Sequence, residues 1–165
     1  METAPLARWV DFAVVAGGAS AALTGLLFVA ISINVDRVGR SISLRSRGGQ
    51  TLVLFAVTLV VSIVLAVPDQ GLTVFGVELL VLVVLAGSGL LVLDRRAKRE
   101  ARTPALARTL DLVSPNVATL VLIAAAAFVA LSGHAWGVYL LVPSTVIAIV
   151  GGVANAWLFL TEVAD

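Results

Sequence analysis

Five long apolar runs constrain this chain more than any other feature. They cover residues 12–35, 50–67, 72–93, 115–132 and 135–161. A helix that crosses a hydrocarbon core about 30 Å thick needs about 20 mostly apolar residues. Four of the runs contain no Asp, Glu, Lys or Arg, and the third contains only Glu78. The sequence therefore predicts an all-α integral membrane bundle of five transmembrane helices, which forms a single domain over residues 1–165.

Composition excludes several classes of protein. Hydrophobic residues make up 60% of the 165 residues and charged residues 13%, whereas soluble domains are about 45–50% apolar and about 25% charged. A soluble fold of this size cannot bury so much apolar surface. The chain has no Cys, and its only His, His134, lies in a short turn. We therefore expect no catalytic residues, no cofactor and no metal site, and we expect a protein that is not an enzyme.

The breaks between the runs carry turn and capping signals. Pro68–Gly71 reads Pro-Asp-Gln-Gly, which is typical of a turn. Gly133-His134 is so short that the flanking spans must form an antiparallel hairpin. Ser114-Pro115 predicts a helix N-cap followed by proline at the first helical position. Thr103-Pro104 repeats that pattern before a segment that we expect to form an amphipathic helix at the membrane interface.

Positive charge is confined to two of the connections. Ten of the eleven Lys and Arg residues fall in the segments 36–49 and 94–112, which we expect to be loops. The positive-inside rule places both segments in the cytoplasm, with the N-terminus outside and the C-terminus inside. We therefore expect a multi-pass protein of the bacterial cytoplasmic (inner) membrane. The basic loops would contact anionic lipid headgroups, and no motif accompanies them that predicts nucleic-acid binding.

Aromatic residues with a polar edge support the same orientation. Such residues favour the level of the lipid headgroups. Trp9, Trp136 and Tyr139 would lie at the outer interface, and Trp157 near the inner one.

Glu78 is the acidic residue that lies well inside a predicted span. It is six residues into the third run, about 9 Å along the helix at 1.5 Å per residue. A charge inside a membrane costs a few kcal/mol unless it is paired, hydrated or protonated. Glu78 is therefore a candidate intramembrane polar site for a proton or cation. In the structural alternative, it lies near the outer interface and is hydrogen-bonded to Ser, Thr or Asn of another helix, or it reaches the headgroups.

Two sets of residues in the first run indicate different roles. Small residues at helical spacing favour close helix packing, and these are Gly18, Ala22 and Gly25. The second set is a sparse series of polar residues that share one helix face, namely Ser20, Thr24 and Asn34. In the alternative interpretation these three residues would line a narrow path.

Pro143 lies about eight residues into the fifth run. Proline removes a helix hydrogen bond, so a kink is expected there. Structural accommodation is the simpler interpretation, and a gating hinge is the alternative.

The first span also resembles a known group of proteins. Its sequence is FAVVAGGASAALTGLLFVAISIN, and VPDQ (67–70) and GVELL (76–80) follow later in the chain. These segments are similar to a family of small, uncharacterised multi-pass membrane proteins found mainly in actinobacteria. Their first span resembles AGAAAALTGLLFVALSIN. The resemblance implies an integral membrane protein without an assigned activity.

Two functions remain open from the sequence. The first is a non-enzymatic membrane protein that acts by assembly, either as a homo-oligomer or as a subunit or modulator of a membrane complex. The alternative is a small ion or proton channel or transporter, in which Glu78 and the polar face of the first helix line the path.

Overall fold

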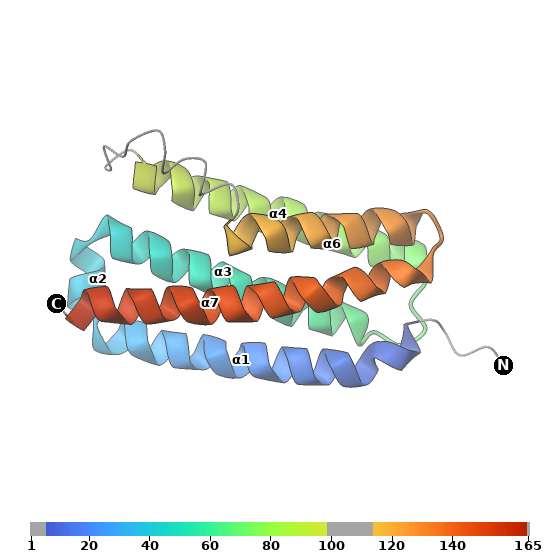
Figure 1. The fold of residues 1–165 in the computed structure, drawn as a ribbon, viewed down its shortest axis with the longest axis horizontal. Coiled ribbons are helices and arrows are strands. Elements are labelled where there is room, and N and C mark those ends of the chain that lie inside the picture. The colour runs from blue at the N-terminus through green and yellow to red at the C-terminus, as the bar shows by residue number, and fades with distance from the viewer. Residues whose placement is uncertain (1–5, 99–113, 165) are drawn as a thin grey trace.

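A computed structural model describes residues 6–98 and 114–164, and every element in these ranges is helical (Figure 1). In chain order they are the 3₁₀ turn η1 (Ala7–Trp9), α1 (Val10–Ile33), α2 (Val35–Arg40), α3 (Ile42–Leu65), α4 (Leu72–Lys98), α6 (Pro115–Leu131), the 3₁₀ segment η3 (Ala135–Leu140) and α7 (Leu141–Ala164).

Helix α3 is the centre of the bundle. It packs against α1 on one side and α4 on the other, and it also packs against α7, while α6 packs against α4 and α7 (Figure 1). The side chains of Leu54 and Phe55 on α3 are almost fully buried, as are Phe75 and Leu79 on α4. Helices α1 and α4 are therefore the edges of the bundle, with most of their surface left to the surroundings.

Four of the helical segments are long and apolar enough to cross a membrane, namely 7–33, 44–65, 72–93 and 135–160. Each matches one of the predicted spans. The remaining predicted span, 115–132, which is the fourth in chain order, forms α6, an apolar helix of 17 residues. At 1.5 Å per residue α6 is about 26 Å long, a little shorter than a typical hydrocarbon core.

The turn and cap predictions are confirmed where they fall on described residues. Asp69 adopts a left-handed backbone (φ 54°) in the turn between α3 and α4, and Gly133 (φ 81°) does so between α6 and η3. Ser114 is the N-cap of α6, where its Oγ accepts a hydrogen bond from the amide of Val117, and Pro115 is the first helical residue. The predicted interface helix after Thr103-Pro104 lies outside the described residues.

The basic segment 36–49 is helical, which differs from the loop that the sequence predicted. Residues 35–40 form α2, and α3 begins at Ile42 instead of near residue 50. Ser41 caps α3, because its Oγ accepts a hydrogen bond from the amide of Leu44 (3.3 Å). Hydropathy detects only the apolar part of a helix, whereas backbone hydrogen bonding continues into the polar region. The other basic segment begins within α4, which extends to Lys98, and 99–113 lie outside the described residues.

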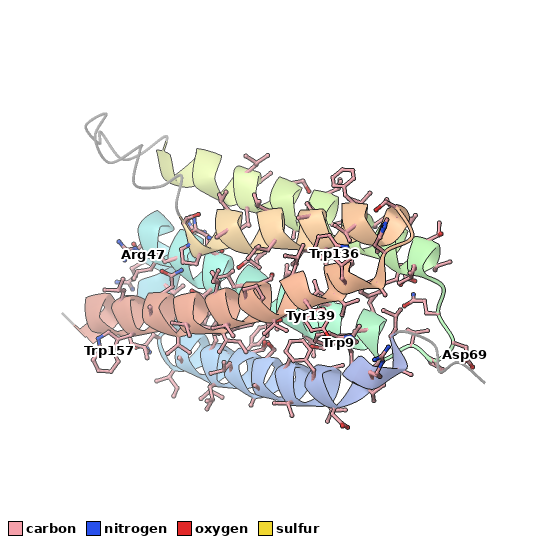
Figure 2. All side chains as sticks on the ribbon, turned by 45° about the vertical axis from the view of Figure 1, so that its right-hand side comes forward. Trp9, Arg47, Asp69, Trp136, Tyr139 and Trp157 are labelled. Carbon is pink, nitrogen blue, oxygen red and sulfur yellow. The ribbon has the colours of Figure 1, made fainter. Side chains whose placement is uncertain are left out.

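The two ends of the bundle differ in chemistry. Trp9, Trp136 and Tyr139 lie toward the end that holds the turn with Asp69, and Trp157 and Arg47 lie toward the opposite end (Figure 2). The rings of Trp9 and Tyr139 meet edge to face with their centroids 4.7 Å apart. The basic helix α2 joins α1 to α3 at the end near Trp157 (Figure 1). The predicted division of the aromatic residues, with Trp9, Trp136 and Tyr139 toward one end and Trp157 toward the other, is thus present in the fold.

Candidate functional site

One face of α1 is buried in the bundle. Ala16, Ser20 and Leu27 on this face are buried, and Gly17 lies so close to α3 that a Cβ there would be 3.1 Å from Cβ of Ser62. Thr24 is partly buried on the same side. This face therefore packs against the centre of the protein.

Two residues of the predicted polar series of α1 lie on this inner face. Oγ1 of Thr24 donates a hydrogen bond to the carbonyl of Ser20 (2.8 Å), and Nδ2 of Asn34 donates one to the carbonyl of Ala30 (2.9 Å). Ser20 is fully buried, and its Oγ has no hydrogen-bond partner among the described residues. Ser20 and Thr24 lie on this face, whereas Asn34 is the C-cap residue just after the end of α1. The predicted polar path along Ser20, Thr24 and Asn34 stays a prediction, and the side chains of Thr24 and Asn34 bond to carbonyls of α1.

The small residues Gly18, Ala22 and Gly25 lie on the opposite face of α1. All three are exposed, and a Cβ placed on Gly18 or Gly25 would meet nothing within 4 Å. At 100° per residue, positions 18, 22 and 25 lie within about 60° of one another and about 180° from the buried face. These three residues, called the small face below, make no close contact within the described chain. The predicted close packing of Gly18, Ala22 and Gly25 stays a prediction for contact with another chain.

Glu78 is held by the turn that precedes its own helix. The side-chain amide of Gln70 donates a hydrogen bond to Oε2 of Glu78. Gln70 is 9% exposed and Glu78 is partly buried. The partner is thus a glutamine of the connecting turn and not a hydroxyl or amide of another helix. The sequence signal for this partner was Gln70 itself, a polar residue in the connecting turn that lies eight residues before Glu78.

Glu78 and the polar face of α1 do not come together. Glu78 is on α4, Ser20 is on α1, and α3 lies between these two helices (Figure 1). In the described part of one chain, Glu78 and Ser20 therefore line no common space. The second interpretation from the sequence required such a shared path.

Pro143 lies near the start of a helix, whereas the sequence placed it about eight residues into the fifth run. The run 135–161 is divided into η3 and α7, and Pro143 is the third residue of α7. The amides of the first helical turn have no partner within their helix, so proline is tolerated there without the loss of a hydrogen bond. Pro143 is exposed. This placement accounts for Pro143 without a hinge, and the hinge stays a prediction.

Sequence reasoning missed a buried polar contact between α6 and α7. Oγ of Ser144 donates a hydrogen bond to the carbonyl of Thr119 (3.2 Å). Thr119, Ser144 and Thr145 are buried, and so is Asn116, whose Oδ1 has no hydrogen-bond partner within residues 6–98 and 114–164. Buried polar residues in a helix of a membrane protein mark helix contacts, so the polar positions 116, 119, 144 and 145 were the available signal.

No group of three or more His, Asp or Glu side chains that could hold a metal ion occurs among the described residues. Comparison of the chain with protein-family models, with curated proteins and with solved structures finds no match.

Proposed function

We propose that this protein is a non-enzymatic, multi-pass membrane protein that acts by assembly through the small face of α1. The proposed contact is with a second copy of the chain, and the assembled protein would serve as a subunit or modulator of a membrane complex. The observation that carries the proposal is that a Cβ on Gly18 or Gly25 would meet nothing within 4 Å in the described part of the chain.

The energetics of glycine support this proposal. Glycine inside a helix costs about 0.5–1 kcal/mol relative to alanine. Other glycines of this chain have a reason to be small, because a Cβ at Gly76, Gly137 or Gly151 would come within 3 Å of a neighbouring side chain. Gly18 and Gly25 lack such a reason inside the chain. Small residues four apart let two membrane helices approach closely, and van der Waals contact drives their association.

We further propose that the bundle crosses the bacterial cytoplasmic membrane five times, with α6 as one of the five spans and the basic end in the cytoplasm. Successive long helices run in opposite directions (Figure 1), which is consistent with alternating spans. The arginines of α2 and of the start of α3 gather at one end, as the positive-inside rule requires of the cytoplasmic side.

Cysteine cross-linking tests the assembly. The chain has no Cys, so Ala22→Cys introduces the only thiol, in the middle of the small face. In a two-fold symmetric contact a residue near the axis faces its own copy, so mild oxidation in membranes should produce a covalent dimer. Val84→Cys is the matched control, because Val84 is 67% exposed near the middle of α4, on the other side of the bundle.

A second substitution shows whether the dimer depends on the small face. Gly25→Leu should abolish the cross-link of Ala22→Cys, whereas Gly89→Leu should not, although neither glycine has a neighbour within 4 Å. Equal cross-linking through Ala22→Cys and Val84→Cys would indicate random collision and would overturn the proposal. So would the absence of a cross-link through Ala22→Cys.

A further inference from the structure

An apolar groove runs between α1 and α7 in the half of the bundle that carries α2. Its volume is about 210 Å³, and Phe55 of α3 is among its lining residues. On α1 the lining extends from Leu23 to Ala30, and on α7 it extends from Val153 to Leu160. Seven residues correspond to about 10 Å along a helix. One leaflet of a hydrocarbon core is about 15 Å thick, so the groove covers about two thirds of one leaflet.

The groove ends beside the basic helix α2. Val38 of α2 packs against Ile31 and Phe159, which directly neighbour the lining residues Ala30 and Leu160. Packing of Val38 therefore fixes α2 at this end of the groove. Arg37 and Arg40 flank Val38 on α2 and are both exposed.

The rim of the groove carries an aromatic residue typical of the headgroup level. Trp157 lines the groove and is 68% exposed. It lies at the same end of the protein as Arg47 (Figure 2). Along the helices, the apolar groove thus comes first, Trp157 lies at its rim, and Arg37 and Arg40 follow. A phospholipid aligned with the helices has its acyl chain and its headgroup in the same order.

We propose that the groove binds one acyl chain of a phospholipid whose anionic headgroup lies against Arg37 and Arg40. The acyl chain accounts for the apolar lining, and the charge of the arginines selects an anionic headgroup over a zwitterionic one. Asp36 on the same helix is exposed, and the formal charges of Asp36, Arg37 and Arg40 sum to +1. This inference does not rest on the proposed assembly, because the groove and the small face are different surfaces of α1.

Fluorescence quenching in vesicles of defined composition tests the site. The variant Trp9→Phe/Trp136→Phe keeps Trp157 as the only tryptophan, because the chain has three. It is placed in vesicles that contain phosphatidylglycerol or phosphatidylcholine with identical dibrominated acyl chains. We expect stronger quenching of Trp157 by the brominated phosphatidylglycerol at equal mole fraction. Near a membrane surface each arginine contributes about fivefold to the affinity for anionic lipid.

Two substitutions separate the parts of the site. Arg37→Gln/Arg40→Gln should remove the preference for phosphatidylglycerol, whereas Arg8→Gln at the other end of the protein should not. Ala156→Leu should reduce quenching of Trp157 by the brominated lipid, because the larger side chain fills the groove. As a second measurement, native mass spectrometry counts the phosphatidylglycerol molecules bound to the wild-type protein and to this variant.

Three results would overturn the inference. One is equal quenching by the two lipids, and another is a preference for phosphatidylglycerol that survives Ala156→Leu, which would indicate headgroup contact alone. The third is quenching that falls as the protein-to-lipid ratio rises, because a second copy of the chain would then cover the groove.

Discussion

Gly151→Ala provides a sharp test of how α6 and α7 meet. A Cβ at position 151 would lie 2.4 Å from Cβ and 2.7 Å from Cγ of Pro115. Ordinary van der Waals contact begins near 3.4 Å, so the two groups are about 1 Å too close. The ring of Pro115 has no other rotamer into which it can move, because it is bonded to its own backbone. The two helices must therefore separate.

The magnitude follows from two opposing terms. Overpacking of a tight contact costs about 1–3 kcal/mol, and alanine gains up to about 1 kcal/mol over glycine in helix propensity. We expect Gly151→Ala to lower the free energy of unfolding by about 1–2 kcal/mol. Gly25→Ala is the matched control, because its Cβ meets nothing within 4 Å. It should leave the stability unchanged or raise it, and it keeps the small face small.

The assay is reversible unfolding in mixed micelles, followed by the helical circular dichroism signal as the denaturing detergent is increased. Wild type, Gly151→Ala and Gly25→Ala are compared at one protein concentration. Equal stability of Gly151→Ala and wild type would refute the close approach of α6 and α7. An equal loss in both variants would show that the effect does not come from this contact.

Three further predictions concern the ends and the interior of the bundle. Gln70→Leu removes the hydrogen-bond partner of Glu78 and should lower the free energy of unfolding by about 1–3 kcal/mol. Glu78→Gln keeps an acceptor for Gln70 and should lower the free energy of unfolding by less. The same unfolding assay measures both variants, and a larger loss for Glu78→Gln would contradict the pairing. Ser144→Ala removes one hydrogen bond between helices and should cost about 0.6 kcal/mol, with Ser144→Thr as a control that keeps the hydroxyl. A reporter that is active only in the cytoplasm should work when fused after Ser46 and be silent after Gly71, and the opposite pattern would invert the orientation.

Local features of this fold could be predicted from the sequence because they depend on local chemistry. Apolar runs with at most one charged residue predicted the long helices, since a helix satisfies its own backbone hydrogen bonds in lipid. The turn at Pro68–Gly71 and the cap at Ser114 followed from residue types whose preferences act within a few positions. The start of α3 at Ile42 was missed because the capped first turns of that helix are polar, and hydropathy does not register them.

The partners of individual residues were decided by tertiary structure. Gly25 and Gly151 both lie in apolar helices, yet one is exposed and the other meets Pro115 of another helix. The sequence cannot separate these two cases, because lipid tails are as apolar as leucine and a side chain that faces lipid has the same hydropathy as one that faces protein. The same reason applies to Ser20, which could line a path or face α3. The sequence by itself determined which segments form apolar helices, four of them long enough to cross a membrane, and only the arrangement of the helices decided which face of each segment meets protein.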